Sequence, residues 1–255
     1  MQYENHTLAC QSAMARATTR LALNKLLDLL LPPHCLLCGL PSTRACICPP
    51  CREDLPRTGH CCVQCGLPLT AEGDSLCGQC LGRAPPFVHT VYPLQYLFPV
   101  DRLVQSFKFN RQLAAGRVLA RLMCEHVVRQ QSSCPEALIP MPLHTLRLFQ
   151  RGFNQAFELA AYVGHEIGIP LVAGSLRRKR HTRAQSGLSG QQRRRNGRGA
   201  FQWRGWHPPP RHVALVDDVM TTGTTVAECA RVLKRAGSKR VDVWVAARAV
   251  PGSRR

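Results

Sequence analysis

Four pairs of cysteines in the first third of the chain restrict its fold more than any other feature. Each pair has the form Cys-x-x-Cys, and the pairs are Cys35/Cys38, Cys48/Cys51, Cys62/Cys65 and Cys77/Cys80. Two residues between thiolates let both sulfurs reach one metal ion at about 2.3 Å. We see no secretory signal and expect a cytoplasmic protein, in which such pairs indicate metal rather than disulfides. The spacing therefore predicts two zinc sites of four cysteines each.

The simplest assignment joins consecutive pairs, 35/38 with 48/51 and 62/65 with 77/80. Interleaved pairing is an alternative, and Cys46 and Cys61 are alternative ligands beside the pairs. Gly39 and Gly66 each follow the second cysteine of a pair, where glycine permits a tight turn that points N–H groups at sulfur. A module this small takes its folding energy from the metal. Its role is either a structural staple or a contact surface for nucleic acid or protein.

Beyond Pro85-Pro86 the sequence alternates between predicted strands and helices. We expect a strand or hairpin over residues 88–98, and a helical segment over 101–131 that breaks near Asn110. The remaining predicted elements are a buried strand at Ala137–Leu143, a helix at Gln155–Glu166 capped by Asn154, strands at Val213–Val216 and Val241–Ala247, and a helix between them that ends at Gly237. This order predicts an α/β domain with a largely parallel sheet flanked by helices.

The predicted organisation is an extension over residues 1–32, a zinc-binding module over 33–84 and the α/β domain over 85–255. In parallel sheets, ligands bind beyond the carboxyl ends of the strands. The two most informative loops fall at that edge. We expect loss of Cys62 and Cys65 to unfold the zinc module and to spare ligand binding by the α/β domain.

The first of these loops is Asp217-Asp-Val-Met-Thr-Thr-Gly-Thr-Thr225. Asp217 and Asp218 follow an apolar strand, are expected to face solvent, and can accept hydrogen bonds from a vicinal diol such as that of ribose. Thr221, Thr222, Gly223, Thr224 and Thr225 lead into a helix, whose first N–H groups and dipole form an anion site. The loop therefore predicts a site for a sugar 5′-phosphate. In the alternative interpretation the aspartates bind Mg²⁺ directly, although Mg²⁺ usually relies on the substrate's phosphates.

The second loop follows the strand at 137–143 and carries Arg147, Arg151 and Gly152. Guanidinium groups bind phosphate bidentately, and the helix that starts after Asn154 adds N–H donors. Because this loop belongs to the same sheet edge, we expect it to hold a pyrophosphate group.

The charge balance favours polyanionic partners, since 34 Lys and Arg against 15 Asp and Glu give a net charge of +19. Residues 167–216 contain no acid and include Arg193, Arg194 and Arg195, followed by Phe201, which we expect in the core, and by two tryptophans. This segment is a candidate lid over the ligand or a candidate track for single-stranded DNA. The longest apolar run is far shorter than the ~20 residues of a membrane span.

The segment Val213–Thr225 resembles the phosphoribosyl pyrophosphate (PRPP) motif of type I phosphoribosyltransferases. The segment from Pro142 to Gln155, with its Arg-Gly-Phe-Asn-Gln end, is similar to the ComF family of competence-associated proteins. So are the Phe107-Lys-Phe109 stretch, the cysteine pairs, and two downstream patterns of Arg180, Thr182, Gln185 and Leu188, then Arg193, Asn196, Ala200 and Phe201.

The resemblance implies a zinc-finger module joined to a type I phosphoribosyltransferase-like domain. It further implies that Asp217 and Asp218 are the catalytic-site carboxylates holding the ribose hydroxyls, and that residues 221–225 hold the 5′-phosphate. Mg²⁺ would bridge pyrophosphate and ribose. The implied role is DNA uptake in natural transformation, with other DNA-uptake or recombination proteins as partners. Two functions stay open: an enzyme that transfers phosphoribosyl to an unknown acceptor, and a non-catalytic DNA-handling factor that uses the pocket as a sensor.

Overall fold

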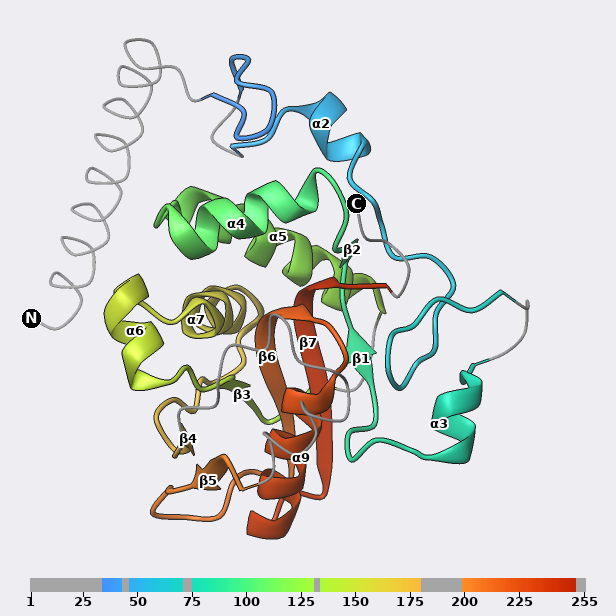
Figure 1. Ribbon diagram of the computed structural model, residues 1–255, viewed down its shortest axis with the longest axis vertical. Coiled ribbons are helices and arrows are strands. Elements are labelled where there is room, and N and C mark those ends of the chain that lie inside the picture. Colours follow the sequence, from blue (N-terminus) through green and yellow to red (C-terminus); the bar gives the residue numbers. More distant parts are fainter. Residues whose placement is uncertain (1–33, 43–45, 71–74, 131–133, 180–198, 251–255) are drawn as a thin grey trace, which may run out of the picture. The chain divides into compact units, whose positions relative to one another are not determined.

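The computed structural model describes residues 34–42, 46–70, 75–130, 134–179 and 199–250. The chain divides into two compact units, Met1–Glu53 and Asp54–Arg255, so that the boundary separates the first two cysteine pairs from the last two. Figure 1 draws both units along the colour gradient of the chain. Each is described by itself below.

The described part of the first unit contains a small knuckle and one short helix. An antiparallel bridge between His34 and Pro41 closes the knuckle around the first cysteine pair, and α2 (Pro49–Glu53) carries the last cysteine. Cys35, Ile47 and Cys48 are its buried side chains in the described region. Because the described part of this unit buries few apolar side chains, we expect metal binding by its cysteines to contribute much of its stability.

The second unit repeats the knuckle and continues into a parallel α/β domain. A bridge between Cys61 and Pro68 matches the His34–Pro41 bridge of the first unit. The elements that follow are α3 (Gly78–Gly82), β1 (Thr90–Val91), β2 (Leu94–Gln95), α4 (Val100–Phe109), α5 (Leu113–Gln130), β3 (Ala137–Pro140), α6 (Thr145–Arg151), α7 (Gln155–Ile167), β4 (Leu176–Arg178), β5 (Phe201–Trp203), β6 (His212–Met220), α9 (Thr224–Ala236) and β7 (Arg240–Arg248).

The central sheet has the strand order β1-β7-β6-β3, with β2 paired to β7 further along, and all of these pairings are parallel. The predicted α/β class with a largely parallel sheet is therefore confirmed. The predicted strand or hairpin at 88–98 is two short strands, β1 and β2, which both run parallel to β7 and so do not pair as a hairpin.

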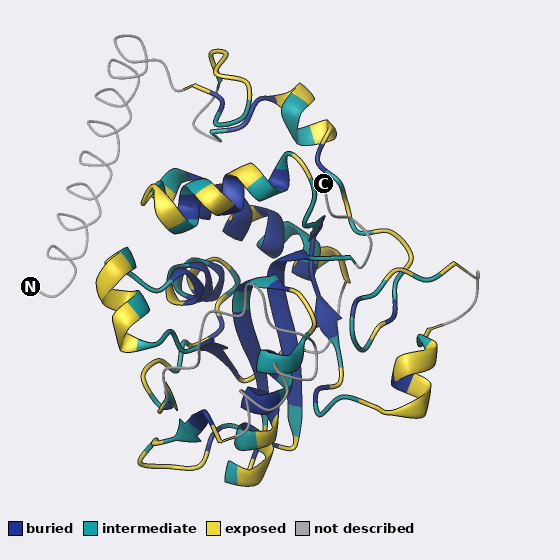
Figure 2. Ribbon diagram, viewed as in Figure 1, coloured by how far each residue is buried: buried dark blue, intermediate teal, exposed yellow. Residues whose placement is uncertain are grey.

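Helices contact the sheet on two sides. Val213 and Leu215 of β6 share a buried cluster with Cys229 and Leu233 of α9. Alternate side chains of a strand point to opposite faces, so the buried Ala214 of the same strand faces the other way, and α5 and α7 also contact the sheet. Figure 2 shows the strands buried between these helices. The expected helix break near Asn110 is confirmed, because Asn110 ends α4 and α5 begins at Leu113.

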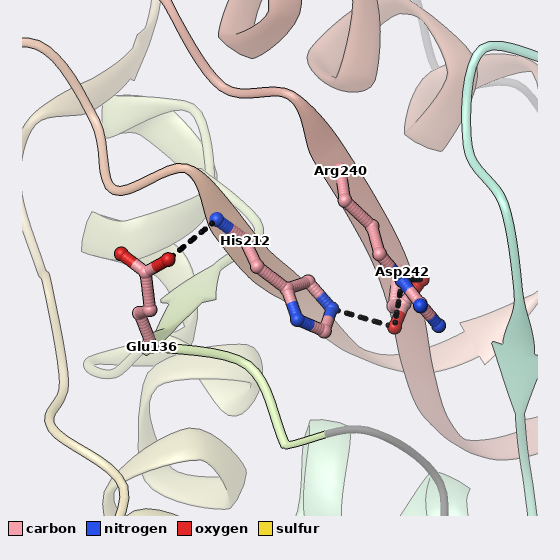
Figure 3. A network of polar contacts seen from close by, with 4 residues as sticks. All are labelled: Glu136, His212, Arg240 and Asp242. Atoms are coloured by element: carbon pink, nitrogen blue, oxygen red, sulfur yellow. Dashed lines mark hydrogen bonds and ion pairs between the residues drawn. The ribbon is translucent and has the colours of Figure 1, made fainter.

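A polar network fixes the amino-terminal edge of the sheet (Figure 3). His212 Nε2 lies 2.8 Å from Asp242 Oδ2, and Arg240 Nε donates to the same carboxylate at 3.1 Å. The backbone N–H groups of Arg211 and His212 donate to the Glu136 carboxylate at 3.2 and 3.3 Å. These contacts link the starts of β3, β6 and β7, so the opposite, carboxyl-terminal edge is the one left for a ligand.

Two expectations need correction. The strand expected to end at Val216 continues to Met220, because Asp217, Val219 and Met220 stay in parallel register with β7. The basic loop after β3 is partly the helix α6, which His144 caps by accepting a hydrogen bond from the Leu146 N–H at 3.2 Å.

The antiparallel pair β4–β5 flanks residues 180–198, which lie outside the described residues. The candidate nucleic-acid residues Arg193, Arg194 and Arg195 belong to that range. Phe201 of β5 is buried, which confirms its expected place in the core.

Candidate functional site: two cysteine quartets and a carboxylate–phosphate edge

Each cysteine quartet brings four sulfurs together, and the consecutive pairing is the one observed. Within Cys35, Cys38, Cys48 and Cys51, and within Cys62, Cys65, Cys77 and Cys80, all Sγ atoms lie within 4.8 Å of one another. Sγ–Sγ distances are 3.7 Å for Cys38–Cys48 and 3.5 Å for Cys65–Cys77. Four sulfurs at 2.3 Å around one zinc ion are about 3.8 Å apart, so both quartets fit a tetrahedral zinc site.

The first cysteine of each quartet has a lowered thiol pKa. Burial raises the pKa of Cys35, but hydrogen bonds from nearby backbone N–H groups outweigh it and lower the pKa to about 6. The same balance of burial against backbone N–H donors lowers the pKa of Cys62 to about 7. Zinc binds thiolates, so each knuckle presents a ligand that is already partly ionised at neutral pH.

The second quartet is built onto the α/β domain. The Tyr92 hydroxyl donates to the Gly66 carbonyl at 2.8 Å, and the Thr90 hydroxyl donates to the Gln64 carbonyl at 2.6 Å. Arg248 Nε donates to the Cys65 carbonyl at 3.0 Å. Gly66 has φ +69°, and a Cβ there would lie 2.8 Å from the Tyr92 ring. Strands β1 and β7 therefore form the platform on which this knuckle rests.

The two aspartates at the carboxyl-terminal half of β6 have different surroundings. Asp218 is buried and forms an ion pair of 3.0 Å with Lys108 at the end of α4. Asp217 is half-buried and accepts a hydrogen bond from the Asp218 N–H at 2.9 Å. The expectation that this pair faces solvent beyond the strand is wrong, because β6 extends past both residues and Asp218 is buried.

Burial, followed by the charge of Asp218, raises the pKa of Asp217 to about 7, and Lys108 and Arg151 offset only part of that rise. Asp217 therefore changes charge near neutral pH, in contrast to an ordinary surface aspartate.

The threonine loop lies directly after this pair and opens α9. Gly223 has φ +71° and forms the cap of α9, a backbone conformation that favours glycine. The Thr222 and Thr224 hydroxyls lie 2.9 Å apart, and Thr221 and Thr222 are exposed. N–H groups at the start of a helix and adjacent hydroxyls together suit a phosphate. Thr225 lies in the first turn of the same helix.

The predicted pyrophosphate residues lie on α6 and at its end. Arg151 stacks over the Phe109 ring at 5.3 Å and donates to Gln155 Oε1 at 3.0 Å. Burial lowers the pKa of Arg151, and the nearby Asp218 carboxylate offsets part of this. Gly152 caps α6 with φ +78°, and Arg147 is half-buried on the same helix. Arg151 therefore lies close enough to Asp217 and Asp218 for their charges to interact.

Sequence reasoning missed three polar residues of this edge: Lys108, Gln155 and Arg248. Lys108 is the central residue of a Phe-Lys-Phe stretch, a signal that was visible. Gln155 is buried, and its Nε2 has no hydrogen-bond partner among the described residues. Arg248 ends a strand of apolar residues, and only the three-dimensional structure shows what it contacts.

The fold and the site define a protein that joins a pair of cysteine knuckles to a parallel α/β domain. Residues 26–81 match the double zinc ribbon domain family. The chain is 36% identical to competence protein F of Haemophilus influenzae, over 80% of this chain and 90% of that protein. It is 35% identical to the DNA utilization protein YhgH of Salmonella typhimurium, over 85% of this chain and 97% of that protein. The chain belongs to the ComF family of competence proteins.

Solved structures similar to this chain include two phosphoribosyltransferases. Orotate phosphoribosyltransferase from Aeropyrum pernix has a TM-score of 0.34 and 22% identity, with 54% of this chain and 61% of that chain covered. Purine phosphoribosyltransferase from Pyrococcus horikoshii has a TM-score of 0.31 and 15% identity, with 65% and 95% covered. Among the described residues, no helix combines the length and the apolar character that crossing a membrane requires.

Proposed function

We propose that the protein binds PRPP at the carboxyl-terminal edge of its sheet and acts in the cytoplasmic handling of DNA during uptake. The observation that carries this proposal is the placement of Asp217 and Asp218 directly before the helix-opening loop Thr221–Thr225. A ribose diol and a 5′-phosphate lie on one sugar, and this edge offers acceptors for the diol and donors for the phosphate. Relatives named for competence and DNA utilization support the cellular role.

The residues have distinct roles in this proposal. Asp217 and Asp218 accept the ribose hydroxyls, while Thr221, Thr222, Gly223, Thr224 and Thr225 hold the 5′-phosphate. Arg147, Arg151 and Gly152 hold the pyrophosphate. Lys108, which forms an ion pair with Asp218, adds a cation beside the carboxylate pair. Mg²⁺ fits as a partner of the pyrophosphate oxygens, because the described residues of this edge offer one carboxylate pair and Lys108 forms an ion pair with one of its two members.

Two activities are compatible with such a pocket. In a transferase, the bond from the anomeric carbon to pyrophosphate breaks, and the nucleophilic atom of the acceptor bonds to that carbon and loses its proton. The carboxylates stabilise the positive charge that develops on the ribose. In a sensor, PRPP binds and stays intact. A pyrophosphate-release assay with candidate acceptors, with and without single-stranded DNA, separates the two. Steady release of pyrophosphate supports a phosphoribosyltransferase with a role in nucleoside metabolism. PRPP binding without pyrophosphate release supports the sensor.

Calorimetric titration with PRPP and Mg²⁺ tests the binding site. The variant carrying Asp217→Asn and Asp218→Asn keeps the side-chain size but removes both charges, and we expect its affinity to fall at least about a hundredfold, since each lost charged hydrogen bond costs about 1.5–3 kcal/mol. Asp54→Ala, at an exposed acid of the same unit, is the matched control and should bind like wild type. Equal binding by the double variant would contradict the assignment.

We also propose contact with single-stranded DNA, because exposed aromatic rings occur together with arginines. Phe149 on α6 is 88% exposed, and Phe109 beneath Arg151 is 67% exposed. Rings stack on bases while cations track the backbone. Arg193, Arg194 and Arg195 extend the same chemistry into the acid-free segment.

Fluorescence anisotropy with a labelled oligonucleotide over a salt series tests this contact. Replacing Arg193, Arg194 and Arg195 by alanine should reduce the slope of log affinity against log salt by about two, because each phosphate contact on a single strand contributes about 0.7. The matched control removes Arg231, Lys234 and Arg235 of α9 and should change the slope less. No binding of the wild-type protein at low salt would reject the DNA contact.

A further inference from the structure

Arg248 joins the second cysteine knuckle to the start of the phosphate loop. It is the last residue of β7 and is only 3% exposed. Its Nη1 donates to the carbonyl oxygens of Met220 at 3.1 Å, of Ala249 at 2.6 Å and of Thr221. Its Nε donates to the Cys65 carbonyl at 3.0 Å. One planar guanidinium group therefore contacts both the metal-binding turn and the residues that precede Thr222.

The charge of Arg248 needs a counter-charge close by. Among the described residues, Arg248 donates to backbone carbonyls and forms no ion pair with a carboxylate. A buried cation without an anion is costly. Four thiolates around one Zn²⁺ carry a net double negative charge, and Cys65 is one of the four. The loaded second quartet thus supplies the anion that a buried guanidinium at this position requires.

We propose that Arg248 is a positioning residue through which zinc at Cys62, Cys65, Cys77 and Cys80 holds the phosphate loop in its binding conformation. The guanidinium ties the carbonyls of Met220 and Thr221 in place, and the zinc–thiolate anion keeps the guanidinium buried. This inference rests on the proposed phosphate site at Thr221–Thr225. It replaces the expectation that loss of Cys62 and Cys65 spares ligand binding.

Hydrogen exchange of the amides of residues 220–226, recorded without PRPP, measures directly whether Arg248 and zinc stabilise the phosphate loop. Arg248→Gln should retain two zinc ions by native mass spectrometry and should speed exchange in this segment about tenfold, because bonds from a charged donor are lost. PRPP affinity should fall by about the same factor. Arg240→Gln, at the opposite end of the same strand, is the matched control and should leave the 220–226 exchange unchanged. Arg248→Lys, which keeps the charge, should restore part of the protection.

Stepwise removal of zinc from the wild-type protein with a chelator provides a second measurement that needs no variant to fold. Exchange at 220–226 should rise as the second quartet loses its metal. Unchanged exchange, either there or in a folded Arg248→Gln protein, overturns the proposal. If wild type fails to bind PRPP while the exchange behaves as expected, the phosphate-site proposal fails and the link from zinc to the loop stands.

Discussion

The two cysteine knuckles have the same local design and different surroundings. In both, a glycine with positive φ follows the second cysteine, Gly39 at +74° and Gly66 at +69°. In both, the N–H of that glycine donates to the carbonyl of the first cysteine, at 2.9 Å for Cys35 and 2.8 Å for Cys62. A Cβ on Gly39 would meet nothing within 4 Å, but one on Gly66 would meet Tyr92 and Thr90.

The different surroundings of Gly39 and Gly66 show which properties depend on the Cys-x-x-Cys-Gly motif and which depend on the surrounding fold. The Cys-x-x-Cys-Gly turn determines metal binding in both places, since its N–H groups and sulfurs are local. The second knuckle packs against β1 and β7, and its Cys65 carbonyl accepts a hydrogen bond from Arg248. In the proposal above, the second metal site is linked to the candidate ligand edge, and the first site serves as its control.

Removing one zinc site at a time should produce the largest contrast. Cys65→Ser with Cys77→Ser should leave one zinc ion, destabilise the α/β domain by several kcal/mol, of the order of a structural zinc site, and weaken PRPP binding more than about tenfold. Cys38→Ser with Cys51→Ser should also leave one zinc ion and keep PRPP affinity within about twofold. Metal analysis, thermal unfolding and calorimetry measure the three quantities. If both double variants weakened PRPP binding equally, the second zinc site would have no special link to the ligand edge.

Alanine at the two glycines gives the next contrast. Gly66→Ala should cost about 2–4 kcal/mol, since positive φ adds strain and the new Cβ would lie 2.8 Å from the Tyr92 ring. Gly39→Ala carries the backbone strain alone and should cost about 1–2 kcal/mol of the free energy of unfolding of its unit. Chemical denaturation with zinc present measures both. If Gly39→Ala lost more unfolding free energy than Gly66→Ala, the surroundings of Gly39 would have to be packed at least as tightly as those of Gly66.

A pH series tests the ligand edge independently of both knuckles. Asp217 has its pKa raised to about 7 by burial and by Asp218, so the folded protein binds a proton that the unfolded chain releases near pH 4. Stability should therefore fall as pH rises from about 4 to 7, while PRPP affinity should rise about tenfold from pH 6 to 8 as the carboxylate ionises. Asp217→Asn should flatten both profiles. The variant of Cys38 and Cys51 should keep the wild-type profiles, and a change in them would link the first quartet to this edge.

The smallest expected effect concerns the hydroxyl of Tyr92. Tyr92→Phe removes the 2.8 Å hydrogen bond to the Gly66 carbonyl and keeps the ring contact, so the domain should lose about 1 kcal/mol of stability. Tyr96→Phe is a control at a partly exposed tyrosine of the same unit and should change stability less. Equal thermal shifts for the two variants would show that the hydroxyl does not anchor the second knuckle.

The sequence predicted those parts of the site that depend on local pattern. The consecutive cysteine quartets, the Asn154 cap and the threonine loop that leads into α9 are all encoded within a few residues. The parallel sheet followed from the alternation of strands and helices. The sequence could not show that β6 continues through Asp217 to Met220, because that depends on pairing with β7 about thirty residues later. Arg248 was missed for the same reason, since its acceptors include carbonyls of two distant segments, at Cys65 and at Met220 and Thr221.

The most direct test of the account is hydrogen exchange of the two-zinc protein with and without PRPP and Mg²⁺. The account predicts that PRPP slows exchange in residues 220–226, at the end of β6 and the start of α9, and that removing zinc from the second quartet accelerates exchange in the same residues. The first knuckle should be unaffected by PRPP. If saturating PRPP leaves residues 220–226 unchanged, the phosphate site does not lie on this loop, and the central claim is wrong.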